Sequence, residues 1–476
     1  MIVTRFFEPS IAQASYLIGC AAAGEAIVID PNRDIAHYLA AAARDHVRIT
    51  HVTETHIHAD FLSGARELAQ ATGATLLLSD EGDADWKYAF AHEARLLHHG
   101  DRITIGNIHL DVLHTPGHTP EHLSFLITDG AAADRPLAAA TGDFIFVGDV
   151  GRPDLLERAA HMAGTMEQGA RTLWRSLRAF DSQEDWLQIW PGHGAGSACG
   201  KGISAIPYST LGYERRFNWA FAVPTEEAFV IKVLEGQPEP PAYFAIMKAL
   251  NKRGPDLRRT SAPPRLDATR LPALVSAGAV VVDTRAAADF ATAYLPGTLN
   301  LPLNGSFVTW AGWLLPYADD FYVIVDRDDD AAVAELVRQL ALIGLDRVAG
   351  IFSADAVHQA AAQGVPVATV SQLSAGELAG RLAAGNVQLV DVRGAAEWHD
   401  GHIASATHIP LGYLSTRLAE LAPDRPIVVQ CRGGGRSAIA ASLLRRLGRP
   451  DVLNLTDGID GWRDAGLPIV DRPGGA

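Results

Sequence analysis

The sequence has few cysteines, no long apolar run and no excess of positive charge. Its three cysteines, Cys20, Cys199 and Cys431, are odd in number and far apart, which does not describe a disulfide framework. The longest apolar stretches, such as residues 274–282, fall well short of the roughly 20 residues that a membrane helix needs. Lys and Arg number 40 against 55 Asp and Glu, and this net charge of -15 disfavours nucleic acids and anionic membranes as partners.

The N-terminus and the cysteine usage point to the same compartment. The opening segment, MIVTRFFEPS, turns polar within a few residues and lacks an apolar core followed by a small-residue cleavage site. We therefore expect no export, and a protein of the reducing cytoplasm. In that compartment, any important thiol has a chemical role rather than a structural one.

The length and the apolar content predict several folded domains. The chain has 476 residues, of which 48% are hydrophobic and 20% are charged, so several cores can close. In the first 200 residues, short apolar runs read as buried strands, and residues 61–72 as an amphipathic helix, which predicts an α/β unit. These runs end in polar turns, where sites are usually built: AIVID ends at Asp30, ITHVTET at Thr55, LAAATGD at Asp143 and LQIW at Trp190.

An internal repeat follows a Pro-rich, basic connector at residues 236–265, which is predicted to hold one short helix. The segment VVDTRAAADFATAYLPGTLNLPL matches LVDVRGAAEWHDGHIASATHIPL, and a second apolar strand and a helix follow in each copy. Each copy reads as a small α/β domain. The predicted domains are residues 1–250, 265–360 and 370–472, and only the last has a cysteine at its loop.

Histidines and aspartates gather at predicted strand ends in the first domain. Two imidazoles and a carboxylate brought together there would leave coordination positions open, as metal-dependent hydrolysis or oxygen chemistry requires. Four motifs in this setting outweigh the alternative of capping side chains. The motifs are THIHADF with His56, His58 and Asp60, PGHT with His118, TGD with Asp143, and PGHG with His193.

These motifs, in this order, resemble the metallo-β-lactamase superfamily, which implies an αββα sandwich over about residues 1–250. In the hydrolase branch the first motif ends in a further histidine that supports a second metal, and here Phe61 occupies that position. The resemblance therefore points to the persulfide dioxygenase branch, with one non-haem Fe(II) per chain. It implies His56, His118 and Asp143 as ligands, with His58, Asp60 and His193 around them to orient the ligands and hold water.

Three further residues near these motifs are candidates for binding the substrate. Arg152, in FVGDVGRPDL, could hold the carboxylate of a thiol substrate in a bidentate pair, or could clamp its own loop through Asp154. Cys199 and Lys201 follow His193 closely. Cys199 could be a buried small apolar residue or could relay sulfur.

Cys431 ends the strand IVVQ, and CRGGGRS leads from it directly into a helix. Glycines let backbone N–H groups turn toward the sulfur, and the helix N-terminus with nearby arginines would stabilise a thiolate nucleophile. With DVR, GHI, HIP and a late GW, this last segment resembles a rhodanese. The predicted loop consists of Cys431, Arg432, Gly433, Gly434, Gly435, Arg436 and Ser437.

The first copy of the repeat resembles the same fold without its chemistry. Asp326 stands where Cys431 stands, and DRDDDAA replaces CRGGGRS, so no persulfide chemistry is expected there. The acidic run 328–330 is interpreted as a solvated surface, and the copy as a scaffold.

Together the three parts resemble the persulfide dioxygenase and rhodanese fusions. The resemblance implies oxidation of a low-molecular-weight thiol persulfide, such as glutathione persulfide, by O2 to sulfite and thiol. Cys431 would exchange sulfane sulfur with thiosulfate or persulfide, in sulfide detoxification or sulfur metabolism. Two alternatives stay open: a zinc thioester hydrolase of the glyoxalase II type fused to a rhodanese, and a sulfur carrier or sensor. The expected assembly is a homo-oligomer, a dimer or tetramer, with no nucleic acid or membrane partner.

Overall fold

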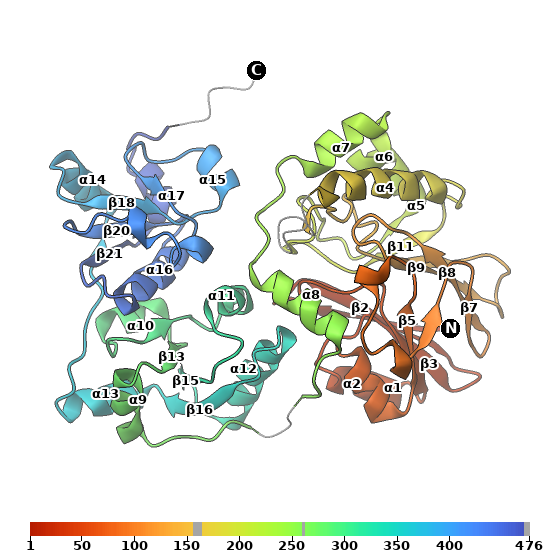
Figure 1. The fold of residues 1–476 in the computed structure, drawn as a ribbon, viewed down its shortest axis with the longest axis horizontal. Coiled ribbons are helices and arrows are strands. Elements are labelled where there is room, and N and C mark those ends of the chain that lie inside the picture. The colour runs from red at the N-terminus through yellow and green to blue at the C-terminus, as the bar shows by residue number, and fades with distance from the viewer. Residues whose placement is uncertain (156–163, 259–261, 471–476) are drawn as a thin grey trace. The chain divides into compact units, whose positions relative to one another are not determined.

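The computed structural model describes residues 1–155, 164–258 and 262–470 (Figure 1). The chain folds into two compact units. One comprises Met1–Arg259 with Ala341–Gly344, and the other comprises Thr260–Leu340 with Leu345–Ala476. The first holds the histidine motifs, and the second holds both copies of the internal repeat. The exact domain ranges given above, residues 1–250, 265–360 and 370–472, are kept as predictions.

The first unit contains two six-stranded sheets. In one, the order is β1-β2-β3-β4-β5-β6, antiparallel up to β3 and parallel beyond it. In the other, the order is β12-β11-β10-β9-β8-β7, and only β10 and β11 run parallel. The strands are β1 (Ile2–Glu8), β2 (Gln13–Cys20), β3 (Glu25–Ile29), β4 (Arg48–Thr53), β5 (Thr75–Ser79), β6 (Arg95–Leu97), β7 (Arg102–Ile105), β8 (Ile108–His114), β9 (Leu123–Asp129), β10 (Ala138–Gly142), β11 (Gln188–Pro191) and β12 (Ser209–Thr210).

Helices cover the outer face of each sheet, which gives four layers. Apolar side chains of both sheets, among them Ile27 and Phe125, form one core between them. Helices pack on the first sheet through Tyr38 and Leu68, and others pack on the second around Leu173. The αββα sandwich predicted for this part is therefore confirmed. The helices are α1 (Ala36–Arg44) and α2 (Ala65–Thr72) on one side and α4 (Thr165–Phe180), α5 (Leu211–Phe217), α6 (Trp219–Ala222) and α7 (Glu226–Leu234) on the other (Figure 1).

The segment interpreted as a connector contributes to the core of the first unit. Its helix α8 (Tyr243–Arg253) buries Phe244 and Met247. Asn251 on the same helix is also buried and donates hydrogen bonds to the carbonyl oxygens of His58 and Phe61, both at 2.8 Å. A segment that its composition marks as a linker thus holds the loop that carries the first histidine motif.

The second unit contains two parallel sheets that share the order of four strands. The first sheet has the order β14-β13-β15-β16. Read from its β19 edge, the second has the order β19-β18-β20-β21-β17, so β13, β14, β15 and β16 correspond to β18, β19, β20 and β21, and β17 is an additional edge strand. The repeat predicted from the sequence is therefore present in the fold. The strands are β13 (Val280–Asp283), β14 (Leu299–Asn300), β15 (Phe321–Val325), β16 (Val348–Ser353), β17 (Gln372–Leu373), β18 (Gln388–Asp391), β19 (Thr407–His408), β20 (Ile427–Gln430) and β21 (Val452–Leu455).

An Asp–Arg pair recurs at the same point of each copy. Arg285 donates to Asp283 at 2.6 Å, and Arg393 donates to Asp391 at 2.6 Å, with all four side chains buried. Each arginine also donates to a backbone carbonyl eight residues further along the chain. The helices of this unit are α9 (Leu271–Ser276), α10 (Ala287–Thr292), α11 (Phe307–Leu314), α12 (Asp330–Leu342), α13 (Asp355–Ala362), α14 (Ala375–Ala383), α15 (Ala395–His399), α16 (Gly435–Arg446) and α17 (Gly458–Asp464).

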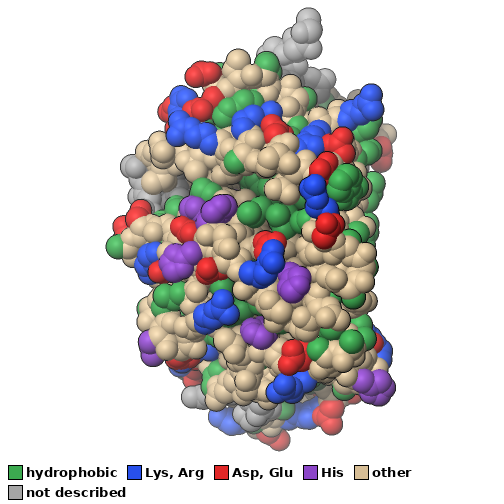
Figure 2. Space-filling model, turned by 90° about the vertical axis from the view of Figure 1, so that its right-hand side faces the viewer, with side chains coloured by type: hydrophobic (Ala, Val, Ile, Leu, Met, Phe, Trp, Pro, Cys, Tyr) green, Lys and Arg blue, Asp and Glu red, His purple; other side chains and the backbone are tan. Residues whose placement is uncertain are grey.

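Two further observations concern the distribution of charged side chains on the surface and the length of the helices. Over the face drawn in Figure 2, lysines and arginines are interspersed with acidic side chains rather than gathered into one basic patch. No helix among the described residues is long and apolar enough to cross a bilayer.

Candidate metal centre and sulfur-transfer loop

The structure brings His56, His118 and Asp143 together inside the first unit. They follow β4, β8 and β10, all three are buried, and their ligand atoms lie within 4.8 Å of one another. Both carboxylate oxygens of Asp143 are buried without a hydrogen-bond donor among the described residues. A buried carboxylate needs a compensating charge, and two imidazoles beside it complete a donor set for a transition metal. The residues present therefore fit a metal ion.

Hydrogen bonds fix which nitrogen of each histidine faces the centre. His118 donates through Nδ1 to the Arg152 carbonyl at 2.9 Å, which leaves its Nε2 beside Asp143 at 3.4 Å. Nδ1 of His56 lies 2.9 Å from Oγ1 of Thr55. Burial and the surrounding histidines hold the pKa of His56 well below its usual value, so the ring is neutral, as a metal ligand must be.

Two residues that support these ligands were missed by sequence reasoning. Asp30 accepts hydrogen bonds from the backbone N–H and the hydroxyl of Thr55, at 2.6 and 2.9 Å. His122 accepts the backbone N–H of Asp143 at 3.1 Å. The available signals were the acidic end of the strand AIVID for Asp30, and the spacing of four from His118 for His122. Such support is usual around metal sites.

His58 lies beside the centre but pairs with Asp30 rather than with the other ligand candidates. Its Nε2 is 3.1 Å from the Asp30 carboxylate. Burial alone would lower the pKa of His58, but the charge of Asp30 and its hydrogen bond outweigh burial and raise it to about 9. Asp30 therefore favours the protonated, positively charged form of His58 next to the site.

Asp60, His193 and Cys199 form a second buried group whose ligand atoms lie within 4.8 Å of one another. His193 donates through Nδ1 to the Ala12 carbonyl at 3.0 Å, and its Nε2 lies 3.2 Å from Asp60 and 3.5 Å from Asp143. Burial and the two nearby carboxylates raise the pKa of the Cys199 thiol well above its usual value. Cys199 is thus part of the centre, whereas its role with substrate stays a prediction.

Arg152 and Lys201 use their charged groups within the protein. The fully buried Arg152 guanidinium forms a bidentate pair with Asp154, at 2.7 Å for both bonds, and also donates to the Ala198 carbonyl. These are the contacts of a loop clamp, one of the two interpretations left open by the sequence. The Lys201 ammonium donates to the carbonyl oxygens of Lys232 and Glu235. Substrate binding by either residue stays a prediction.

Cys431 lies at the carboxyl end of β20, in a loop that leads into α16. The thiol is buried, and Oγ of Ser437 lies 3.4 Å from its sulfur. Gly434 precedes α16 with a φ of 86°, and a Cβ there would lie 1.8 Å from the Thr456 carbonyl oxygen, so only glycine fits. At Gly433 and Gly435 a Cβ would meet nothing within 4 Å. The tight turn therefore depends on the central glycine.

The two arginines of this loop have different surroundings. Arg436 donates to both carboxylate oxygens of Glu397, at 2.6 and 2.7 Å. Arg432 is exposed and pairs with Asp460 at 3.1 Å. Arg436 therefore ties the loop to α15, and Arg432 is the arginine that remains accessible from solvent.

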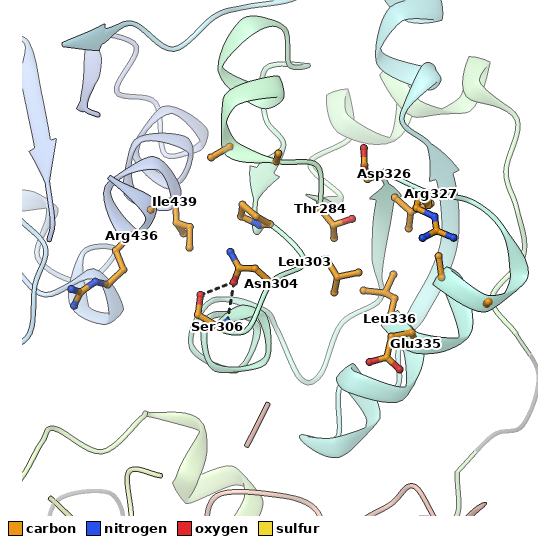
Figure 3. Close-up of a pocket in the computed structure, with 17 residues that line it drawn as sticks. Thr284, Leu303, Asn304, Ser306, Asp326, Arg327, Glu335, Leu336, Arg436 and Ile439 are labelled. Carbon is orange, nitrogen blue, oxygen red and sulfur yellow. Dashed lines mark hydrogen bonds between the residues drawn. The ribbon is translucent and has the colours of Figure 1, made fainter. Parts of the chain in front are cut away.

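The corresponding loop of the first repeat lines a pocket instead of a thiol cradle. Asp326 and Arg327 follow β15 there, and the pocket has a volume of about 740 Å³ (Figure 3). No cysteine or histidine is among its lining residues.

The comparisons with known proteins agree with this geometry. A model of the metallo-beta-lactamase superfamily matches residues 11–193. The crystal structure of a metallo-beta-lactamase from Staphylococcus aureus is 41% identical, covers 74% of this chain and 99% of its own, and has a TM-score of 0.66. The chain belongs to the metallo-β-lactamase superfamily. A model of the rhodanese-like domain matches residues 374–465 of this superfamily member.

Three curated relatives of this metallo-β-lactamase superfamily member have names that state three different activities. The mitochondrial persulfide dioxygenase ETHE1 of Bos taurus is 26% identical over 49% of the chain and 81% of its own length. A hydroxyacylglutathione hydrolase of Rhodospirillum rubrum is 31% identical over 37% of the chain and 60% of its own length. A sulfurtransferase of Allochromatium vinosum is 40% identical over 21% of the chain and 95% of its own length.

Proposed function

We propose that the protein is a persulfide dioxygenase with a sulfurtransferase on the same chain. One thiol persulfide, one O2 and one water would give one thiol, one sulfite and two protons. At Cys431, a thiolate would attack the outer sulfur of thiosulfate, releasing sulfite and leaving a cysteine persulfide that passes its sulfur to an acceptor thiol. Both reactions handle the same sulfane sulfur, which gives the fusion a chemical reason.

The observation that carries the proposal is the donor set His56, His118 and Asp143. Two neutral imidazoles and one carboxylate are typical of non-haem Fe(II) oxygen chemistry, because the metal keeps open positions. When held by these three residues, iron would supply activation of O2 for oxidation of the outer persulfide sulfur. Similarity to ETHE1 supports iron, and the presence of the His and Asp cluster supports a metal in general.

The chain's own residues would orient the ligands and hold charge at this centre. Thr55 and the Arg152 carbonyl keep the two imidazoles turned with Nε2 inward. The protonated His58 places positive charge beside the entering persulfide anion, which favours its binding. Phe61, fully buried with its ring 4.4 Å from that of His58, keeps water out of this side of the site.

In the sulfur-transfer loop, neighbouring groups would stabilise the negative charge on the Cys431 sulfur. The Ser437 hydroxyl lies next to the thiol, and the first turn of α16 presents backbone N–H groups at its N-terminus. Arg432 is accessible to an incoming anion such as thiosulfate. The buried Cys431 sulfur is therefore expected to react only with small donors that enter the loop.

A hydrolase is the second candidate, and one specific observation favours it. Asp60, His193 and Cys199 form a second possible ligand set beside the first, and two adjacent metals are typical of hydrolytic centres. The relative named hydroxyacylglutathione hydrolase is consistent with this candidate. The absence of an imidazole at Phe61 argues against it.

The two candidates are separated by loading the same preparation with Fe(II) or with Zn(II). Each form is assayed for oxygen uptake with glutathione persulfide and for hydrolysis of a glutathione thioester. The dioxygenase proposal expects oxygen uptake from the iron form and no thioester hydrolysis from either form. If the zinc form hydrolyses the thioester and the iron form takes up no oxygen, the dioxygenase proposal is wrong and the hydrolase takes its place.

A further inference from the structure

The pocket of the first repeat lies where parallel sheets usually bind ligands. In the order β14-β13-β15-β16, the chain passes from β13 to β14 on one side and then crosses to β15 on the other side of β13. Ligands bind beyond the carboxyl ends of the strands at such a switch point. Thr284 directly follows β13, Asp326 directly follows β15, and both line the pocket. Its volume of about 740 Å³ is within the usual range for small-molecule sites.

The charges around this pocket leave one carboxylate without a partner. Arg327 donates to Asp329, Arg436 is held by Glu397, and Glu335 accepts from Arg338. For the Asp326 carboxylate, the described part of the chain provides no ion pair and no hydrogen bond. Asp326, which is exposed, is thus the one charged side chain of the lining without a protein partner among the described residues.

The uncharged lining specifies the rest of a ligand. The Asn304 carbonyl oxygen accepts the backbone N–H and the hydroxyl of Ser306, both at 2.9 Å, so its amide N–H groups are left to donate to a ligand (Figure 3). Leu303, Leu336 and Ile439 provide apolar surface. An occupant with an ammonium group, a carbonyl or carboxylate acceptor and an aliphatic body meets all three features.

We infer that this pocket binds an amine-bearing thiol of the amino-acid or short-peptide class, with its ammonium group at Asp326. A polyanionic carrier such as coenzyme A is disfavoured, because its phosphates would meet the uncompensated carboxylate. The assignment of the ligand as a thiol rests on the proposed function, whereas the preference for an amine rests on the pocket alone.

The position of the pocket connects it with the sulfur-transfer domain. Gly435, Arg436 and Ile439 of α16 form one side of it, and Ser437 of the same helix contacts the Cys431 sulfur. A molecule in the pocket therefore contacts the helix that begins in the reactive loop. This is a suitable place for the part of a sulfur donor that does not react.

Calorimetric titration of the full chain with S-methylglutathione tests the inference, because this thioether cannot react at either site. The glutaryl analogue, which has hydrogen in place of the ammonium group, is the matched ligand. Wild type is expected to bind the analogue about fivefold more weakly, as one partly exposed ion pair allows. In Asp326→Asn the two ligands should bind equally. Asp328→Asn, which changes an acid outside the pocket, should behave as wild type.

Two results would overturn the inference: no saturable binding at millimolar concentration, or the same preference for the ammonium in Asp326→Asn as in wild type. A kinetic readout adds to the binding data. Asp326→Asn should raise the KM for glutathione persulfide in sulfur transfer at unchanged kcat. A chain that lacks sulfur transfer altogether but binds S-methylglutathione through Asp326 would contradict the proposed function and leave the pocket assignment standing.

Discussion

His118 donates a hydrogen bond through Nδ1 to the backbone carbonyl oxygen of Arg152, at 2.9 Å. The loop that provides this carbonyl is itself fixed by the bidentate pair between Arg152 and Asp154. A buried ion pair thus sets the orientation of a candidate metal ligand. Arg152 thus contacts the candidate ligand through its backbone carbonyl, while its side chain fixes the loop.

Arg152→Lys is therefore expected to weaken metal binding. Lysine keeps the charge but cannot make the bidentate pair, so the loop would shift and His118 would lose its acceptor. Loss of such support typically costs 10- to 100-fold in metal affinity. Equilibrium metal titration measures it. A raised KM for persulfide with metal affinity unchanged would show instead that Arg152 holds the substrate.

Oxygen uptake and sulfur transfer should be lost independently of each other when their own sites are changed. His118→Ala is expected to abolish metal loading and oxygen uptake while sulfur transfer from thiosulfate continues. Cys431→Ser should abolish sulfur transfer and leave oxygen uptake intact, because Cys431 is absent from the metal cluster. Metal content and the two assays are measured on each variant, with Cys20→Ser as the control for replacing a buried thiol. Loss of both activities in either active-site variant would contradict two separate sites.

Sulfur transfer should depend on the pair between Glu397 and Arg436 and lose activity in acid. Burial alone would raise the pKa of Glu397, but its hydrogen bonds with Arg436 outweigh burial and lower it. Because this carboxylate has a depressed pKa in the folded state, the pair's contribution is complete above the unfolded pKa and disappears as the pH falls through the lowered value.

Glu397→Gln should therefore reduce sulfur transfer about tenfold near neutral pH, the value of one charge-assisted contact, and remove this acid limb. The pH dependence of thiosulfate turnover measures both effects. Glu420→Gln is the matched control, since Glu420 forms a comparable but exposed pair with Arg417. An identical acid limb in wild type and Glu397→Gln would refute the assignment.

The loop of the first histidine motif should open when its contact with α8 is removed. Asn251 donates to the carbonyl oxygens of His58 and Phe61 and accepts the backbone N–H of Ser63. Asn251→Ala leaves these buried groups unpaired, which costs about 2 kcal/mol. Hydrogen exchange of residues 58–63 should accelerate correspondingly. Asn386→Ala, at an exposed position, should leave that exchange unchanged.

Strand ends and repeats were predictable from the sequence, because they depend on local patterns. The runs ending near Thr55 and Asp143 mark β4 and β10, and the ends of these two strands and of β8 bring His56, His118 and Asp143 into one centre. The corresponding strands of the two repeats were found in the same way.

Features set by distant contacts were not predictable. The helix expected over residues 61–72 begins at Ala65, because the preceding residues are held by Asn251 and by the close approach of Gly64 to Asn32. A Cβ at Gly64 would lie 2.1 Å from the Asn32 carbonyl oxygen. The partners of Arg152 and Lys201 depend likewise on loops that meet only in the folded chain.

Oxygen consumption measured together with sulfite tests the central claim most directly. Protein loaded anaerobically with Fe(II) is given glutathione persulfide and a limited amount of O2, and both oxygen and sulfite are followed in one vessel. The account predicts one sulfite for each O2 consumed, with no consumption by His118→Ala. Iron-loaded protein that consumes no oxygen, or consumes it without forming sulfite, would contradict the account.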